Sequence, residues 1–351
     1  MTYLKNLINL IKRNIISIVF LLFTISLVLF SNSNLIAAKS GLKLFANSVV
    51  PSLLPFFIAT ELLSNTNIIE IIGKLLNKFM RPIFNVPGEA AYAFLIGIIS
   101  GYPVGAKIVT KLRKDGVCSK SEGERMLALC NNSGPLFILG TVGISLFKSS
   151  EIGIILLITH ILSCITVGII MGLIDRIQIY YGYKENLVEV RSNKITDISS
   201  IGEILGTSIK NAIFTVTIVG GFVVLFSVII SILNESKIID FICTIINPIF
   251  KTFNIDLNLS KALITGLIEL TNGVSLASSF NSKLISHQVI MCAFLLGFGG
   301  FSVLLQVLSI TSKSDMSIKS YFIGKVCQAI FAAFYTYIIF NFLPFFNLDL
   351  V

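Results

Sequence analysis

The residues best suited to chemistry lie where long apolar runs are interrupted. The first interruption, residues 100–107, combines a hydroxyl, a phenol, glycines, a proline and a lysine. A helix that begins at such a break presents unpaired N–H groups and the positive end of its dipole, and these bind anions. The segment is therefore a candidate anion site, although Lys107 could instead face the cytoplasm and only orient the segment. Its candidate substrate-binding residues are Ser100, Gly101, Tyr102, Pro103, Gly105 and Lys107.

A second polar break follows within the next apolar run. Asn131, Asn132 and Ser133 stand directly before Gly134 and Pro135, a combination that interrupts helices. An amide buried without a hydrogen-bond partner costs roughly 2–7 kcal/mol, so these side chains must face protein, water or a ligand. The accompanying break favours a ligand. Hydrogen bonding between neighbouring helices is the alternative.

An acidic residue ends a short apolar run in the second half of the chain. Glu269 is followed closely by Thr271 and Asn272. A charged side chain at membrane depth costs roughly 2.5–3.5 kcal/mol to insert and marks a functional position by default. Glu269 is thus a candidate carrier of a coupling proton or cation such as Na⁺. The alternative is a carboxylate at the membrane surface that pairs with Lys261 or Lys283.

Glycines mark the last break, at residues 297–300. Gly299 and the nearby Ser302 mirror the break at 131–135 and complete the candidate substrate site, with close helix packing as the competing explanation. His160 and Gln306 also lie in apolar runs, and His160 is better explained as a hydrogen-bonded core residue.

Soluble-enzyme and nucleic-acid functions are disfavoured. No G-x-S-x-G, H-E-x-x-H or phosphate-loop pattern occurs, and the six cysteines form no C-x-x-C pair. With only two histidines, no metal site and no cofactor are expected. The 27 Lys and Arg residues, which give a net charge of +9, lie mostly between apolar runs, as in membrane loops.

The composition requires a membrane. Of 351 residues, 54% are hydrophobic and only 13% are charged, and the mean hydropathy is +0.89. Soluble domains have about 25% charged residues. The sequence predicts an all-α polytopic membrane protein whose first span is uncleaved, with a cleaved signal peptide as the alternative. The predicted spans are residues 15–30, 42–63, 122–147, 152–174, 204–233, 287–308 and 321–342.

Half-length helices and amphipathic helices lie between these spans. A ten-residue helix such as 90–99 covers about half of the hydrocarbon core. Two such helices joined by a Gly/Pro turn form a re-entrant hairpin, which must be buried in protein or line a cavity. The hairpins are predicted at 90–113 and 262–280, and the amphipathic helices at 68–80 and 238–251.

The order of elements is repeated in the two halves of the chain. Pro82-Ile83-Phe84 corresponds to residues 248–250, and discontinuous helices occupy matching positions. Because each half contributes an odd number of spans, the second repeat is predicted to be inverted, with a cytoplasmic N-terminus and most Lys and Arg inside. The predicted regions are an N-terminal transmembrane helix (1–35), a first repeat (36–177), a polar cytoplasmic loop (178–200) and a second repeat (201–345).

Residues 100–107 and 130–136 together resemble the YlbJ-type sporulation integral membrane proteins, which carry nucleoside-recognition Gate domains. The Gate group is similar in architecture to concentrative nucleoside transporters, with two hairpins and two unwound helices around the substrate. The resemblance implies transport of dipicolinic acid, a planar dianion, from mother cell to forespore. It places the chain in the outer forespore membrane or the cell membrane of a spore-forming bacterium.

The expected partners are a small organic anion and membrane lipid, with a coupling proton or Na⁺. No nucleic acid is expected, and a homo-oligomer is compatible with the sequence. Two other functions stay open at this point. One is a nucleoside-type transporter, and the other is a non-transporting membrane scaffold for spore assembly, which would need no deep polar residues. An intramembrane enzyme is the weakest option.

Overall fold

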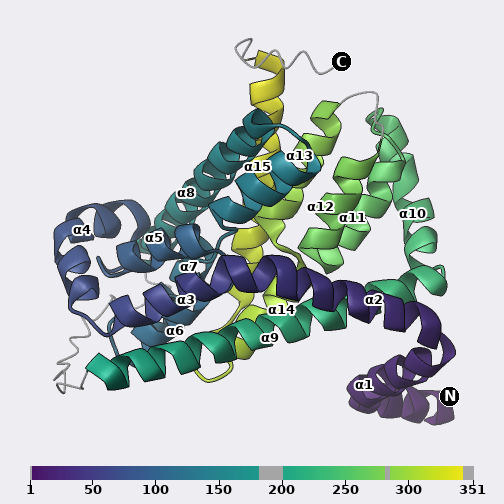
Figure 1. Cartoon of the computed structure of the whole chain (residues 1–351), viewed down its shortest axis with the longest axis horizontal. Helices are drawn as coiled ribbons and strands as arrows, with labels where there is room; N and C mark the ends of the chain where they lie inside the picture. The colour runs from purple at the N-terminus through teal and green to yellow at the C-terminus, as the bar shows by residue number, and fades with distance from the viewer. Residues whose placement is uncertain (1, 182–200, 281–284, 343–351) are drawn as a thin grey trace.

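A computed structural model describes residues 2–181, 201–280 and 285–342 (Figure 1). Every regular element in these ranges is a helix, which confirms the all-α prediction. By length and apolarity, four stretches of the described chain can cross a membrane: residues 150–180, 201–235, 285–311 and 319–342. A bent pair of helices at the N-terminus would be a fifth span if the two helices count as one. The polytopic prediction agrees with this, while the seven-span topology and the inversion of the repeats remain predictions.

The N-terminal region differs from the single helix predicted over residues 1–35. Helix α1 (Thr2–Leu29) and helix α2 (Ser31–Leu44) meet at an angle of 99°. Asn34 is buried at the bend, and its amide donates to the carbonyl of Ser26 at 3.1 Å, so a polar side chain stabilises the turned backbone. The predicted span 15–30 therefore lies in α1 up to Leu29, and the region 1–35 also includes the start of α2.

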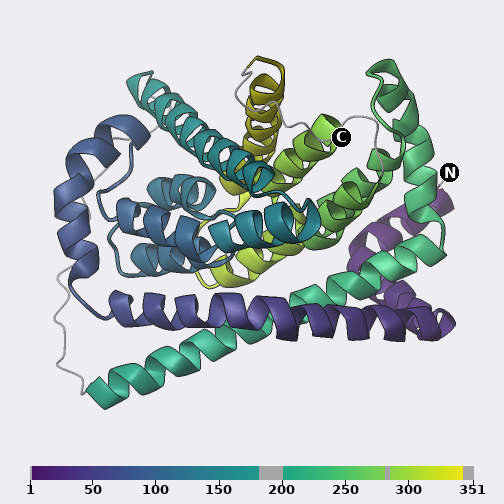
Figure 2. The ribbon, with the colours of Figure 1, turned by 45° about the horizontal axis from the view of Figure 1, so that its top comes forward.

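A long helical segment follows the bend. Helix α2 continues through the π-helical turn η1 (Phe45–Val49) into α3 (Val50–Ser64). Proline at the start of α3 and Pro55 within it lack the N–H that an α-helix needs, and a π-helical turn is a common local adjustment. This segment packs along α9 (Ile201–Glu235), and the two cross beneath the rest of the molecule (Figure 2).

The amphipathic helices form as predicted, and they lie at opposite ends of the molecule (Figure 1). They are α4 (Ile68–Phe84) and α10 (Ile238–Thr252). Ile71, Leu75 and Phe79 on α4 are half or more exposed, as expected of a face that meets lipid.

Both predicted helical hairpins form, and their re-entrant placement in a membrane remains a prediction. The first joins α5 (Ala90–Ser100) to α6 (Val104–Lys114), within a few residues of the predicted bounds. The second joins α11 (Asn258–Ile268) to α12 (Leu270–Ser279). The break predicted around residues 271–273 is wrong in position, because the extended residue is Glu269, and Thr271 and Asn272 lie in the first turn of α12.

Two discontinuous helices cross the hairpins. The first consists of α7 (Lys120–Cys130) and the π-helix η2 (Leu136–Leu146), and the second of α13 (Ile285–Phe298) and α14 (Gly300–Thr311). Both breaks lie where the sequence predicted them, although the π-helical form of η2 was not expected.

Two long helices complete the fold, and buried apolar side chains form a cluster around each hairpin. Helices α8 (Ser150–Tyr180) and α15 (Lys319–Phe342) pack together. Helix α8 extends into the loop predicted at 178–200, most of which lies outside the described residues. Tyr102, at the tip of the first hairpin, packs against both apolar clusters and so links the two halves.

Charged side chains tie α4, α7 and α8 together. Arg125 and Asp175 form an ion pair at 2.8 Å, with both side chains at most 6% exposed. Asn85, which ends α4 in a left-handed conformation, donates to the same carboxylate at 2.8 Å. Its carbonyl accepts from Arg125 at 2.7 Å. The three helices therefore share one buried polar cluster.

The far end of the first hairpin is held by a second ion pair. Arg113 contacts both carboxylate oxygens of Asp315, at 3.0 and 2.8 Å. These hydrogen bonds hold the pKa of Asp315 below its ordinary value. Since Asp315 lies in the loop between α14 and α15, the pair joins the hairpin to the second half of the chain.

Candidate functional site

The first hairpin packs directly against the break that follows α7, with backbone atoms in contact. A Cβ added to Gly97 or Gly105 would lie 1.8 or 1.9 Å from the carbonyl oxygen of Cys130. At the tip, Gly101 has a φ of +79°, and a Cβ there would lie 2.9 Å from the nitrogen of Gly134. Only glycine lets the two backbones come this close, so the glycines allow the hairpin to pack against the break.

The second hairpin meets the break between α13 and α14 in the same way. A Cβ on Gly300, whose φ is +83°, would lie 3.1 Å from both the carbonyl of Gly266 and the nitrogen of Leu270. The neighbouring Gly299 has a φ of +84°, and its missing side chain leaves room for the Tyr102 hydroxyl, 3.0 Å from a Cβ placed there. Each discontinuous helix therefore crosses a hairpin, and the two crossings touch at Tyr102.

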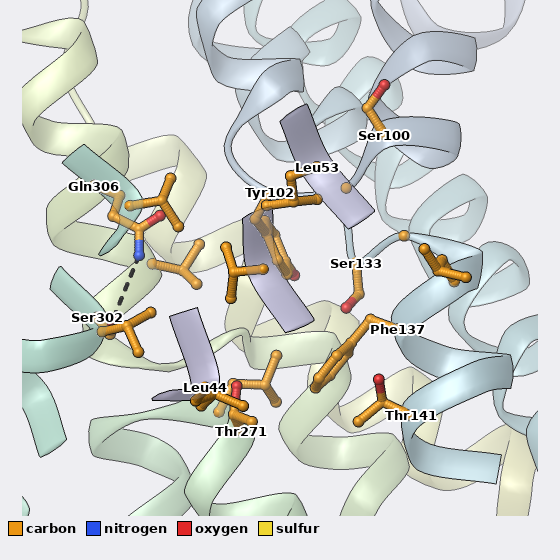
Figure 3. Close-up of a pocket in the computed structure, with 18 of the residues that line it drawn as sticks. Leu44, Leu53, Ser100, Tyr102, Ser133, Phe137, Thr141, Thr271, Ser302 and Gln306 are labelled. Atoms are coloured by element: carbon orange, nitrogen blue, oxygen red, sulfur yellow. Dashed lines mark hydrogen bonds between the residues drawn. The ribbon is translucent and has the colours of Figure 1, made fainter. Parts of the chain in front are cut away.

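A cavity of about 350 Å³ lies between the two crossings (Figure 3). That volume is at the lower end of the range for small-molecule sites, roughly 300–1,000 Å³. Apolar side chains such as Leu44, Leu53 and Phe137 form much of its wall. Hydroxyl, amide and carboxylate groups enter it from both halves of the chain: Ser100, Tyr102, Ser133, Thr141, Glu269, Thr271, Ser302 and Gln306.

The cavity wall brings together half of the predicted substrate-binding residues. Those on the wall are Ser100, Gly101, Tyr102, Ser133, Glu269, Thr271 and Ser302. The other half lies behind the wall or elsewhere: Pro103, Gly105, Lys107, Asn131, Asn132, Asn272 and Gly299. Asn272 lines a separate cavity with Asp240 and Lys261. Substrate binding by the wall residues remains a prediction.

Glu269 is at once a wall residue and the cap of α12. Its carboxylate is 5% exposed and accepts hydrogen bonds from the backbone nitrogens of Thr271 at 3.1 Å and Asn272 at 2.8 Å. Lys261 pairs with Asp240 at 3.2 Å, so the alternative of a Glu269–Lys261 pair is wrong. Lys283, the other suggested partner, lies outside the described residues. The acid thus neutralises the positive end of one helix that points toward the cavity.

Replacing Glu269 by alanine is expected to destabilise the protein by about 1–2 kcal/mol, because two N–H groups of α12 lose their acceptor. Glu269→Gln keeps an oxygen acceptor and should lose less than half of that. Thermal unfolding in detergent measures both. Equal losses for the two variants would show that the charge, rather than the cap, stabilises α12.

Lys107 does not reach the cavity. Its ammonium pairs with Glu61 at 2.7 Å and donates to Thr215 at 2.7 Å, and so ties α6 to α3 and α9. Asn131 likewise has a structural contact, because its oxygen accepts from the nitrogen of Ala106 at 3.3 Å, in the first turn of α6. The structure therefore gives the predicted anion-binding role of Lys107 no geometric support.

A buried lysine behind the wall was missed by sequence reasoning. Lys325, on α15, is 1% exposed, and its ammonium lies 3.2 Å from the Asn132 oxygen and 2.7 Å from the Gln328 oxygen. Gln328 also donates to Asn132 at 3.1 Å. The signal in the sequence was a lysine within the apolar run 321–342, but nothing local indicated which break it faces.

His160 and Gln306 have the hydrogen bonds expected of them. The ring of His160 is buried and accepts from the backbone nitrogen of Ser133 at 3.2 Å. Gln306 is also buried, and its amide lies 3.4 Å from the Ser302 hydroxyl (Figure 3). The interpretation of His160 as a hydrogen-bonded core residue is therefore confirmed.

The helix ends at the crossings give the cavity its electrostatic character. Helices η2 and α14 begin beside it without a side-chain cap, whereas α12 is capped by Glu269 and the first turn of α6 donates to the Asn131 side chain. Uncapped N-termini present N–H groups and partial positive charge. No Lys or Arg of the described residues lines this wall. The arrangement suits a small, flat molecule that carries hydrogen-bond acceptors.

Comparison with known proteins agrees with the resemblance in the sequence. The Gate family, described as nucleoside recognition, matches residues 46–177 and 216–346. The sporulation integral membrane protein YlbJ of Bacillus subtilis (strain 168) is 34% identical over 337 residues, which cover 93% of this chain and 82% of that protein. No solved structure matches the chain.

Proposed function

Because this chain belongs to the Gate family of nucleoside-recognition proteins and is homologous to a sporulation integral membrane protein, we propose that it is a secondary transporter. Its proposed substrate is dipicolinic acid or a related small organic anion, moved from the mother cell toward the forespore. The proposed location is the outer forespore membrane or the cell membrane of a spore-forming bacterium.

The observation that carries this proposal is the cavity between two hairpins and two discontinuous helices. Interrupted helices in corresponding positions of two repeats are the best structural pointer to a transporter binding site. Here both repeats contribute wall residues, for example Ser133 and Thr271. A scaffold protein would have no use for a cavity that polar groups from both halves of the chain line, so the scaffold alternative is disfavoured.

An anionic substrate fits the two uncapped helix N-termini beside the cavity, those of η2 and α14. The apolar wall would contact the faces of a planar ring, and Ser100, Ser302 and Thr271 would donate to its carboxylates. Glu269 would repel a bound anion when it is ionised. We therefore propose that Glu269 takes up the coupling proton, so that proton and anion enter together; a coupling Na⁺ beside the ionised carboxylate is the other way to remove this repulsion.

One observation favours a nucleoside as the second candidate. Glu269 lines the cavity, and no cationic side chain of the described residues lines the same wall. An ionised carboxylate is a strong acceptor for ribose hydroxyls and would favour a neutral solute over an anion.

Uptake by proteoliposomes distinguishes these candidates. We expect the purified chain to concentrate labelled dipicolinate when an inward proton gradient is imposed, and excess uridine not to compete. Glu269→Ala should reduce uptake at least about tenfold, the loss expected for one charge-assisted contact.

The matched control is Glu151→Ala, since Glu151 is an exposed acid in the first turn of α8, remote from the cavity. It should transport like the wild type. Uridine uptake without dipicolinate uptake would favour the nucleoside function, and uptake no greater than in empty vesicles for both solutes would favour the scaffold.

A further inference from the structure

Lys325 is a buried cation that has no acidic partner. Its ammonium contacts neutral groups: the oxygens of Asn132 and Gln328, and the rings of Tyr102 and Tyr321, whose centroids lie 5.4 and 5.7 Å away. No carboxylate of the described residues lies within ion-pair distance of it. The positive charge is therefore only partly compensated inside the protein.

A purely structural role does not explain this charge. A buried ion costs stability unless a partner of opposite charge compensates it, and an apolar residue of similar volume is usually as good or better for packing. The hydrogen bonds to Asn132 and Gln328 need only a neutral donor, which an amide could supply. Within a membrane, an ionisable residue of this kind is a functional position by default.

The lysine lies directly behind the cavity wall. Tyr102 belongs to the wall, and the ammonium of Lys325 lies over its ring. Asn132, which holds the ammonium, is followed immediately by the wall residue Ser133. The Tyr102 ring and the unwound backbone at Asn132 and Ser133 therefore separate Lys325 from the cavity. No Lys or Arg of the described residues lines the cavity wall.

We propose that Lys325 is the positive charge that binds a carboxylate of the substrate, and that it reaches the cavity when the Tyr102 ring moves aside. This assignment rests on the proposed anionic substrate. The lysine stem has four rotatable carbons, so the ammonium can exchange the Asn132 and Gln328 oxygens for a carboxylate. The Tyr102 hydroxyl donates one long hydrogen bond, to the carbonyl of Leu296 at 3.3 Å, and apolar packing holds the rest of the ring.

Asn132→Asp is the sharpest test, because it places an acid beside Lys325 without removing the lysine. The new carboxylate would lie about where the amide oxygen is now, 3.2 Å from the ammonium. We expect the variant to fold and to melt near the wild-type temperature, because the new ion pair with Lys325 offsets the hydrogen bond that the Asn132 amide now donates to the carbonyl of Leu129 at 2.8 Å. We also expect its affinity for dipicolinate, measured by calorimetry on the full chain in detergent, to fall about 10- to 100-fold.

A second pair of variants removes or keeps the charge itself. Lys325→Gln should lose about 10- to 100-fold in dipicolinate affinity. It should bind the neutral analogue of dipicolinate, a pyridine diol in which each carboxylate is replaced by a hydroxymethyl group, as tightly as the wild type does. Lys325→Arg should keep most of the dipicolinate affinity. Lys261→Gln, which removes a lysine from a pair outside the cavity, is the matched control and should bind dipicolinate like the wild type.

The binding results distinguish a failure of the Lys325 assignment from a failure of the proposed substrate. If the wild type binds dipicolinate and Asn132→Asp and Lys325→Gln bind it equally well, Lys325 is structural and the assignment is overturned. If the wild type binds no dipicolinate, the proposed substrate fails, and the assignment fails with it. A Lys325→Gln variant that loses the diol and dipicolinate to the same extent would show a damaged cavity rather than a lost charge, which also contradicts the assignment.

Discussion

Gly105→Ala is expected to leave little or no folded protein. The new Cβ would lie 1.9 Å from the carbonyl oxygen of Cys130, 2.5 Å from its carbon and 2.8 Å from the Cα of Asn131. All three are backbone atoms, so no side chain can rotate to make room. The first hairpin would have to move away from the break, and the loss of unfolding free energy would exceed about 4 kcal/mol, which is exceptional for a single substitution.

The yield of monodisperse protein and its melting temperature measure this effect. Gly221→Ala is the matched control, because Gly221 lies within α9 and nothing stands within 4 Å of a Cβ placed there. Alanine favours a helix over glycine by up to about 1 kcal/mol, so the control should be neutral or slightly stabilised. If Gly105→Ala melted like the wild type, the close packing of the hairpin against the break would be incorrect.

Asp175→Asn is expected to destabilise the protein by about 3–5 kcal/mol, because it leaves the buried guanidinium of Arg125 without its counter-ion. The substitution preserves shape, so the loss reports charge rather than packing. Thermal unfolding measures it. Asp240→Asn, in an exposed ion pair, is the control and should change stability little.

A double variant sharpens this prediction. Arg125→Met combined with Asp175→Leu removes both charges, and buried pairs replaced by apolar residues are often no less stable. The double variant should therefore recover much of the stability that Asp175→Asn loses. A double variant as unstable as the single one would show that the hydrogen bonds of Asn85 to this pair, rather than the charges, hold the cluster together.

Local signals in the sequence were sufficient to predict most helix bounds. Glycine, proline and adjacent amides interrupt a helix wherever they occur, so the first hairpin and the breaks at residues 131–135 and 299 could be located without a structure. The turn of the second hairpin was misplaced because Asn272 and Gly273 look like a break, whereas the carboxylate of Glu269 caps the helix that contains them.

Features set by tertiary contacts could not be predicted. No glycine or proline marks the 99° bend at Phe30, where the Asn34 amide donates to the carbonyl of Ser26 on the other side of the bend. Lys107 stands in a glycine-rich turn, as an anion ligand would, but Glu61, from a helix far away in the sequence, binds it. Lys325 is the converse case, since only the fold brings it next to the wall of the cavity.

The two amphipathic helices are joined to the hairpins by short connections. Five residues separate the end of α4 at Phe84 from the start of α5, and five separate α10 from α11. Exposed apolar residues, such as Leu75 on α4 and Ile245 on α10, suit each helix to the boundary between headgroups and acyl chains. With both helices at that boundary, the distance from the aqueous phase to the cavity would be set by side chains that do not line it.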